Sequence, residues 1–305
     1  MKRVIIFGGS GFLGSYVADE LTGRGYDVVI ADIKPSLYRS EKQKFLFCDI
    51  TDQQCVESAV SDKVDFVYNF AGLADINEAI RMPLRTMQLN VMGNLNILEA
   101  CRNNNVSRFI YASSAYAFSN KGSFYGISKH TCEKLIEEYY NSYGLKFSIV
   151  RYGSLYGERA DEHNYIYNLL KKALLERKII VKHDADDIRE YIHAKDAARL
   201  SVDIIESKDY VNELIVLTGF EKMRRRELFQ MIREILNDEV EYECSNEIIQ
   251  GHYSVTPYSF HPSLARKLMS NPFIDMGQGL VECIRQIHSD IEQEKDNATY
   301  TGVVL

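Results

Sequence analysis

A glycine-rich turn set between two apolar segments constrains the fold more than any other feature of the chain. Val4–Phe7 is a short apolar run that stops at glycine, as a buried parallel strand does. The turn has the spacing Gly8-x-x-Gly11-x-x-Gly14 and leads into a helical pattern, after which a second apolar run ends at Asp32. A strand, a glycine turn, a helix, a strand and an acidic residue in this order predict a βαβ unit that binds a dinucleotide.

Each part of this unit has a physical role toward such a ligand. The three glycines let the backbone approach a pyrophosphate, whose charge is favoured at a helix N-terminus. Phe12 and Leu13 lie within the same turn and are included among the predicted cofactor contacts. The carboxylate of Asp32 is placed to accept hydrogen bonds from ribose hydroxyls and would repel a 2′-phosphate, so NAD is favoured over NADP. A glycine turn without a ligand is the alternative, and the complete context of the motif argues against it.

Strands and helices continue to alternate through the first half of the chain. Apolar runs typical of buried strands occur at 45–48, 66–70, 109–112 and 147–150. Apolar stripes predict a helix at about 84–103 and another that starts near Tyr125. This alternation predicts an α/β fold with a doubly wound parallel sheet, in which ligands bind at the carboxyl ends of the strands.

The alternation of predicted strands and helices becomes less regular after Arg151. Further elements are predicted as helices at 164–177 and 226–236 and as short strands at 191–192 and 214–217. We interpret the second half as a smaller mixed α/β lobe that closes over the cofactor edge. The predicted division is a NAD-binding domain at 1–153 to which 188–219 returns, a substrate lobe mainly at 154–295, and a tail without pattern at 296–305.

A candidate catalytic group lies at the start of the helix near Tyr125. Tyr125 and Lys129 are four residues apart and therefore share one helix face. A neighbouring ammonium favours the phenolate and would lower the pKa of the phenol, which makes Tyr125 a candidate general base. Ser114 could hydrogen-bond the oxygen that loses its proton. Because the chain has 20 Tyr, such a pair also arises by chance as a surface contact, and the dinucleotide unit is what favours a catalytic role.

Composition limits the other possibilities. The 305 residues are 46% hydrophobic and 26% charged, and no apolar run approaches the ~18 residues of a membrane span, so a soluble cytoplasmic protein is expected. The net charge of -7 argues against a nucleic-acid partner. The six Cys are interpreted as reduced thiols without metal-ligand spacing, and no metal is expected. The basic run 224–226 is interpreted as a solvated helix face rather than a binding patch.

Together these features resemble the extended short-chain dehydrogenase/reductase family, specifically its nucleotide-sugar epimerase/dehydratase branch, over about residues 2–285. The motifs that carry the resemblance are the three glycines, Asp32, Asp49-Ile50, Ala71-Gly72, Asn90, Ser114, Tyr125-x-x-x-Lys129, Arg151–Gly157 and Arg189–Asp196. The resemblance implies a Rossmann sheet, NAD as cofactor, a nucleotide-sugar substrate and a homodimer paired through helices 84–103 and 125–143.

The resemblance also implies roles for single residues. Asp49 and Ile50 would flank the adenine, Ala71 and Gly72 would touch the cofactor, and Asn90, Tyr125 and Lys129 would complete its site, with Lys129 on the nicotinamide ribose. The implied substrate contacts are Ser113, Ser154, Arg189 and Tyr258. Arg189 would grip the pyrophosphate of the substrate, and an ordinary ion pair with Asp186 or Asp187 is the alternative. Ser154 stands where many relatives have an Asn, which puts its contact in doubt.

Two departures from the family pattern narrow the reaction. Dehydratases of this branch carry an Asp-Glu pair after the catalytic hydroxyl residue, and related decarboxylases need a Glu there, whereas Ala115-Tyr116 follows Ser114. The spacing of 11 between Ser114 and Tyr125 is short, so the loop 119–124 over the sugar is trimmed.

The remaining set of Ser114, Tyr125, Lys129 and NAD suits oxidation of a sugar carbinol, commonly C4, and return of the hydride. A 4-epimerase is ranked ahead of a 4-dehydrogenase, with a keto-sugar reductase third. A non-catalytic NAD-binding protein and an enzyme for a different carbinol remain as alternatives. The nucleotide base (uracil, guanine, cytosine or thymine) and the sugar are left open, and the trimmed loop leaves room for a heptose as well as a hexose.

Overall fold

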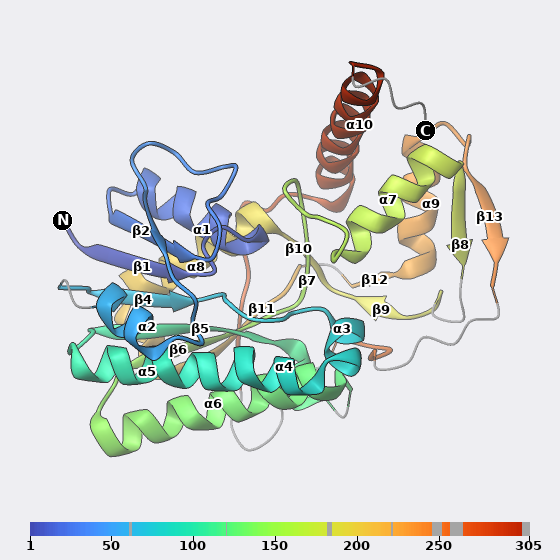
Figure 1. Ribbon diagram of the computed structural model, residues 1–305. Helices are drawn as coiled ribbons and strands as arrows, with labels where there is room; N and C mark the ends of the chain where they lie inside the picture. The colour runs from blue at the N-terminus through green and yellow to red at the C-terminus, as the bar shows by residue number, and fades with distance from the viewer. Residues whose placement is uncertain are drawn as a thin grey trace.

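The computed structural model describes residues 1–60, 63–119, 121–181, 185–220, 222–245, 252–256 and 265–300. Its centre is an eight-stranded sheet, and every neighbouring pair of strands is parallel (Figure 1). In spatial order the strands are β14 (Arg266–Leu268), β11 (Glu213–Leu217), β6 (Phe147–Tyr152), β5 (Arg108–Ser114), β4 (Phe66–Asn69), β1 (Arg3–Phe7), β2 (Asp27–Asp32) and β3 (Lys44–Phe47). The α/β fold with a doubly wound parallel sheet is as the sequence predicted.

Helices cover both faces of this sheet. Helices α1 (Phe12–Gly23) and α8 (Ala194–Glu206) pack on one face, and α2 (Gln53–Val60), α5 (Gly93–Asn103) and α6 (Ser123–Tyr143) pack on the other (Figure 1). Each face has its own hydrophobic core, and β4 and β6 are buried along their whole length. This burial explains why their sequences are nearly continuous apolar runs rather than alternating ones.

The helix predicted at about 84–103 is not a single regular helix. It consists of α4 (Pro83–Met87), a π-helical turn (Gln88–Met92) and α5, and it is preceded by the short helix α3 (Ile76–Arg81). The π turn carries Asn90, whose side chain bonds to other segments instead of pointing to solvent. Such a turn re-aims side chains without breaking the helix, which the apolar periodicity alone does not reveal.

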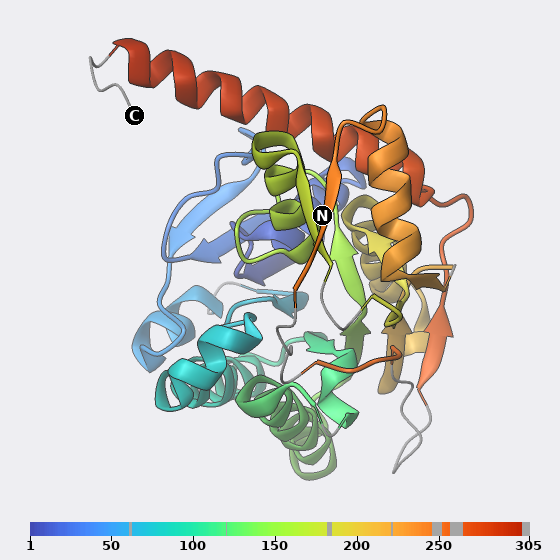
Figure 2. The ribbon, with the colours of Figure 1, turned by 90° about the vertical axis from the view of Figure 1, so that its right-hand side faces the viewer.

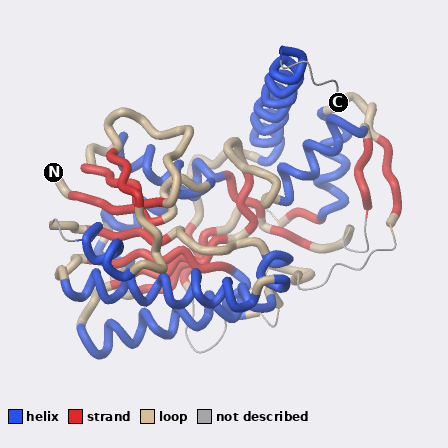
Figure 3. The backbone as a smooth tube through the Cα atoms, viewed as in Figure 1, coloured by secondary structure: helices blue, strands red, loops and turns tan. Residues whose placement is uncertain are grey.

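The second lobe is built mainly from chain after β6. It contains α7 (Tyr165–Glu176), α9 (Arg225–Ile235), α10 (Met276–Tyr300) and the parallel pair β8 (Lys178–Val181) and β13 (Glu241–Cys244) around a separate core. Two further small pairs, β7 (Ser154–Tyr156) with β10 (Tyr191–His193) and β9 (Ile188–Arg189) with β12 (Met223–Arg224), lie between this lobe and the large sheet (Figure 3).

The end of the chain differs from the prediction. Helix α10 runs to Tyr300, into the stretch 296–305 that was predicted to be a tail without pattern. Through Lys295 the last buried residue of α10 is Ile291, and Figure 2 shows the last part of this helix extending past the lobe. Once a helix is nucleated by packing, each further residue adds a hydrogen bond at little cost, so it continues beyond its apolar face. No helix in the described part of the chain is long and apolar enough to cross a bilayer.

Candidate active site

The carboxyl ends of the central strands bring the predicted motifs to one edge of the sheet. Gly8 follows β1, Asp32 ends β2, Ala71 follows β4, Ser114 ends β5, and Ser154 follows β6. Because all of these strands run in the same direction, the five positions meet at the same edge. This edge is where ligands bind in open parallel sheets.

The glycine-rich turn fits a pyrophosphate. Gly8 has a φ of +75°, and a Cβ placed there would lie 2.5 Å from the backbone nitrogen of Ala71. A Cβ at Gly14 would lie 2.3 Å from the carbonyl oxygen of Gly8, so the turn and the start of α1 close only with glycine. No side chain caps the N-terminus of α1, and the buried Ser10 Oγ has no hydrogen-bond partner among the described residues. Unused N–H groups and a buried hydroxyl at a helix N-terminus are what an anionic phosphate requires.

Asp32 closes the same turn. Its Oδ2 accepts a hydrogen bond from the Ser10 backbone N–H at 3.0 Å, and its Oδ1 accepts from the Ile33 backbone N–H at 2.8 Å. Each carboxylate oxygen retains a second lone pair, so the side chain can still accept hydrogen bonds from ribose hydroxyls. The residues present at the glycine turn and at Asp32 therefore fit NAD.

The segment predicted to flank the adenine is held by local contacts. The Asp49 carboxylate accepts hydrogen bonds from the Thr51 backbone N–H and hydroxyl, which hold the pKa of Asp49 below its usual value. Ile50 packs against α5 so closely that a Cβ at Gly93 would lie 2.6 Å from its Cδ1. The contacts of Asp49 and Ile50 with adenine stay a prediction.

Asn90 connects the loop after β4 to the helix that carries Tyr125. Its carboxamide oxygen accepts from the Leu73 N–H at 2.7 Å, and its nitrogen donates to the Leu73 carbonyl at 3.0 Å and to Ser128 Oγ at 2.9 Å. A Cβ at Gly72 would lie 2.6 Å from the Asn90 oxygen, so this contact requires glycine. The structure thus gives Asn90 internal partners, where a direct cofactor contact was predicted.

Ser114, Tyr125 and Lys129 come together at the end of β5. The Tyr125 ring is 9% exposed, and the Lys129 Nζ lies 5.7 Å from its centroid. Burial raises the pKa of Tyr125, and a hydrogen bond with Ser114 acts in the opposite direction. Burial also lowers the pKa of Lys129 to about 8, and its ammonium donates to the Ala112 carbonyl at 2.7 Å. The sequence argument predicted a lowered pKa for Tyr125, but desolvation outweighs the favourable contacts here.

The short loop before Tyr125 is shaped around Tyr116. Helix α6 starts after Gly122, whose φ is +87°, and a Cβ there would lie 2.9 Å from the Tyr116 Cβ. A Cβ at Gly126 would lie 2.7 Å from the Lys121 carbonyl oxygen and 3.1 Å from that of Tyr116. The two glycines therefore let Tyr116 pack directly on the first turn of α6, the helix that carries Tyr125.

Tyr116 forms a polar pair that the sequence argument missed. Its Oη lies 2.8 Å from His252 Nδ1, and its ring stands edge-on to Tyr125 at 6.3 Å and packs on Tyr253 at 4.4 Å between centroids. Burial raises the pKa of Tyr116, and burial lowers the pKa of His252 to about 4. The segment after Ser114 lacks the acidic residues of the dehydratases and decarboxylases, yet it places a phenol beside Tyr125.

Arg189 is already partnered. Its Nη2 lies 3.1 Å from Asp187 Oδ2, its Nη1 donates to the Ser254 carbonyl at 3.3 Å, and its guanidinium lies 4.4 Å from the Tyr253 ring centroid. The ion pair with Asp187, which was the alternative to a substrate contact, is thus present. The Arg189 guanidinium nevertheless lies near the candidate active site, beside the Tyr253 ring, which also contacts Tyr116.

Arg225 is a second buried guanidinium at the site. It begins α9, is 5% exposed, and lies 4.4 Å from the Tyr165 ring centroid. Its charge, followed by that of Arg189, adds to the effect of burial that lowers the pKa of His252. Both guanidinium groups are therefore close enough to act on the Tyr116–His252 pair.

The interpretation of the run 224–226 as a solvated face is wrong for its middle residue. Arg224 and Arg226 are exposed and reach Asp186 at 3.5 and 3.0 Å, while Arg225 points inward. In an amphipathic helix consecutive side chains point about 100° apart, so one charge of a run can lie on the buried face.

Ser113 and Tyr258 stay predicted substrate contacts. Ser113 Oγ donates to Glu133 Oε1 at 2.5 Å, and Glu133 pairs with Arg151 at 2.6 Å in a buried network. The hydroxyl of Ser113 is therefore directed into the interior, because neighbouring side chains on a strand point to opposite faces. Tyr258 lies outside the described residues.

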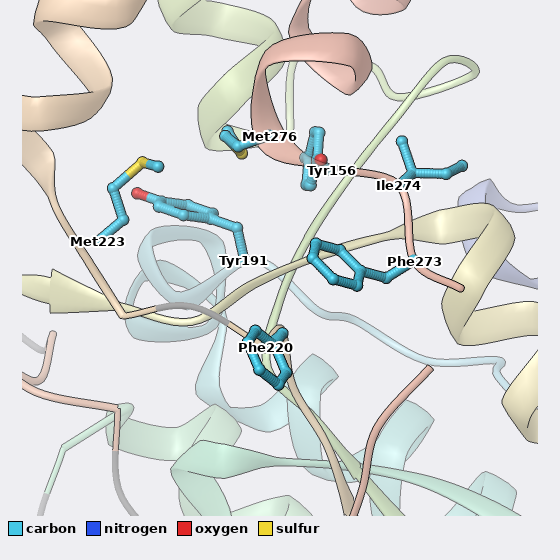
Figure 4. Close-up of a pocket in the computed structure, with 7 residues that line it drawn as sticks. All are labelled: Tyr156, Tyr191, Phe220, Met223, Phe273, Ile274 and Met276. Carbon is cyan, nitrogen blue, oxygen red and sulfur yellow. The ribbon is translucent and has the colours of Figure 1, made fainter. Parts of the chain in front are cut away.

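A small cavity lies between the sheet and the second lobe (Figure 4). Its volume is ≈ 30 Å³, and it is lined by Tyr156, Tyr191, Phe220, Met223, Phe273, Ile274 and Met276. The buried Tyr191 hydroxyl has no hydrogen-bond partner among the described residues, and this volume suits a water molecule rather than a sugar. Within the described ranges no cluster of three or more His, Cys, Asp or Glu could hold a metal ion.

Comparisons with known proteins find relatives among nucleotide-sugar epimerases. A putative UDP-glucose 4-epimerase of Methanocaldococcus jannaschii is 27% identical over 250 residues, which cover 75% of this chain and 81% of the relative. The structure of the UDP-N-acetylglucosamine 4-epimerase of Methanobrevibacter ruminantium M1 is 26% identical, with a TM-score of 0.79, and covers 96% of this chain and 99% of that one. The UDP-glucose 4-epimerase of Thermotoga maritima, at 22% identity, shows the fold alone, with a TM-score of 0.82 and coverage of 95% and 99%.

The match to a protein family covers most of the Rossmann sheet. Residues 4–217 match the family described as NAD dependent epimerase/dehydratase. This range includes the glycine turn, Asp32 and the set of Ser114, Tyr125 and Lys129. The chain is therefore an enzyme of the NAD-dependent epimerase/dehydratase family, and its cofactor is NAD.

Proposed function

We propose that the chain is a 4-epimerase of a UDP-hexose. The observation that carries this proposal is the cluster of Ser114, Tyr125 and Lys129 at the carboxyl edge of the sheet, beside a glycine turn that fits NAD. Relatives at 26–27% identity are named as 4-epimerases of UDP-sugars, which supports both the nucleotide and the reacting carbon. The segment after Ser114 lacks the Asp-Glu pair that dehydratases of this branch carry, which favours a reaction without loss of water.

Proton transfer falls to Tyr125 in this proposal. Its Oη takes the proton of the sugar hydroxyl and later returns it, while Ser114 Oγ hydrogen-bonds the same oxygen. The Lys129 ammonium, close to the phenol ring, favours the phenolate form of Tyr125 that accepts this proton. NAD, when bound, supplies the acceptor for the hydride and gives the hydride back. Ser10, the glycine turn and Asp32 would hold that cofactor.

The diphosphate of the substrate carries negative charge that the site must balance. Arg189 and Arg225 are buried guanidinium groups, and both act on His252 next to the catalytic helix. Asp187 balances part of the charge of Arg189. We infer that the two arginines bind the diphosphate from the side of the second lobe, because a planar guanidinium matches phosphate oxygens.

The test is product analysis with the purified protein and UDP-glucose, UDP-galactose and their 2-acetamido counterparts. The proposal expects interconversion of the C4 epimers with no net NADH. A matched Tyr125→Phe variant should lose about 10²–10⁴-fold in rate while it still contains NAD. Stoichiometric NADH together with a keto sugar would instead identify a 4-dehydrogenase, and full activity of Tyr125→Phe would contradict the assigned base.

A further inference from the structure

The pair formed by Tyr116 and His252 is not used in the mechanism above. The two residues are 136 positions apart in the chain, and the 2.8 Å contact between Oη and Nδ1 is a hydrogen bond of normal length. Tyr116 is held on three further sides by Gly122, by the edge of Tyr125 and by the ring of Tyr253. Its hydroxyl therefore has one defined position next to the catalytic phenol.

The direction of this hydrogen bond follows from the chemistry of its two groups. Burial and two neighbouring guanidiniums keep the imidazole of His252 neutral near pH 7, so its Nδ1 can accept a hydrogen bond. A phenol is a stronger acid than a neutral imidazole N–H, so the phenol is the better donor. Tyr116 thus uses its only O–H in a hydrogen bond to His252. Its oxygen can still accept a hydrogen bond from another group, but Tyr116 has no further proton to donate.

The position of Tyr116 decides which part of a sugar it meets. Its ring centroid lies 6.3 Å from that of Tyr125, so the two rings are in edge-to-face contact. A sugar that presents a carbinol to Tyr125 and Ser114 would therefore lie beside Tyr116 as well, and we infer that a substituent next to the reacting carbon meets the Tyr116 oxygen.

We propose that Tyr116, with its proton held by His252, is a specificity residue that accepts a hydrogen bond from a neutral hydroxyl of the sugar and disfavours a carboxylate there. A hydroxyl can donate to the Tyr116 oxygen, whereas a carboxylate offers only acceptors and would face lone pairs. The positive charges of Arg189 and Arg225 do not reverse this preference for a hydroxyl over a carboxylate. Arg189 is paired with Asp187, and in the proposed function both arginines bind the diphosphate. The inference rests on that function and names its substrate class as a neutral hexose rather than a hexuronic acid.

The experiment measures binding in a Tyr125→Phe background, where turnover does not interfere. Calorimetry with UDP-glucose and UDP-glucuronic acid gives the preference, which we expect to favour UDP-glucose by about tenfold or more. Adding His252→Phe frees the Tyr116 proton to donate, so the preference should fall several-fold through tighter binding of UDP-glucuronic acid. Adding His252→Asn restores an acceptor for that proton and should keep the preference.

A Tyr116→Phe variant removes the oxygen itself. It should weaken the binding of UDP-glucose, because an acceptor is lost, and improve that of UDP-glucuronic acid, because the opposing lone pairs are gone, so the preference should fall. If His252→Phe and Tyr116→Phe both leave the preference unchanged, or if the starting protein prefers UDP-glucuronic acid, the inference is wrong. Conversion assays use the unmodified chain, which keeps Tyr125. If the binding preference is found but the unmodified chain does not epimerise its substrate, the proposed function is refuted and the role of Tyr116 in binding is not.

Discussion

Lys129, a proposed catalytic residue, is buried where its charged form is unfavourable. It is 7% exposed, and burial lowers its pKa to about 8. Between pH 8 and the ordinary lysine value of about 10.4, the unfolded chain binds more protons than the folded chain, so this group makes the free energy of unfolding rise with pH. Below pH 8 the folded protein keeps a buried ammonium, at a cost of about 3 kcal/mol.

We therefore expect Lys129→Met to stabilise the fold while it impairs the reaction. At pH 7 the free energy of unfolding should rise by up to about 3 kcal/mol, because the buried charge is gone, although the bond to the Ala112 carbonyl is lost as well. Rates should fall by about 10²–10⁴-fold, because Tyr125 loses the cation that favours its phenolate. Denaturant unfolding at pH 7 and pH 10 checks this, and a gain that is equal at both pH values would argue against the linkage.

Among the elements, the turn between β1 and α1 depends on close backbone contact. Gly14→Ala would place a Cβ 2.3 Å from the Gly8 carbonyl oxygen, so the turn must open and NAD affinity should fall by at least about tenfold. Gly23→Ala, in the last turn of the same helix, meets nothing within 4 Å and should bind NAD normally. Equilibrium titration with NAD compares the two variants, and equal affinities would show that the turn is not the phosphate site.

Helix α9 offers a second pair of matched variants. Arg225→Met removes a buried guanidinium from the proposed diphosphate site and should raise KM for the UDP-sugar by about 10–100-fold with little change in kcat. Arg226→Met removes a neighbouring exposed charge that pairs with Asp186, and it should change KM by less than about twofold. Competitive inhibition by UDP gives an independent readout, since only Arg225→Met should weaken it. Equal changes in KM for the two variants would contradict a diphosphate contact of Arg225 and indicate a purely structural role.

At the scale of the whole molecule, the helices on one face of the sheet carry apolar side chains that no described residue covers. Leu84, Met92 and Ile127 are 72%, 54% and 56% exposed on α4, the π turn and α6. These helices are the ones that the family resemblance predicts to pair in a homodimer. Burial of such side chains between two copies would be favourable at about 25 cal/mol per Å².

The prediction is a dimer in solution at micromolar concentration, measured by sedimentation. Ile127→Arg should shift the protein toward the monomer, because it places a charge inside the expected interface. Leu175→Arg on α7 replaces a side chain of similar exposure, 53%, in the other lobe and should leave the dimer intact. A monomeric mass for the unmodified protein would contradict the expected pairing.

The sequence by itself determined the sheet, the cofactor turn and the catalytic spacing. These features are local: apolar periodicity defines strands and helices, glycine spacing reflects steric contacts within a few residues, and Tyr125 and Lys129 share a face because a helix repeats every 3.6 residues. The family resemblance rests on the same short motifs. None of these features requires knowledge of which distant segments meet.

Only the tertiary structure decided which polar groups face one another. Tyr116 is hydrogen-bonded to His252, and Ser113 is hydrogen-bonded to Glu133. Asn90 is hydrogen-bonded to Leu73, and Arg225 is buried although it lies in a basic run. Burial then sets the charge states, raising the pKa of Tyr125 and lowering that of Lys129. Contacts over such separations, and the desolvation that accompanies them, arise from packing of the whole chain, which no local pattern of residues encodes.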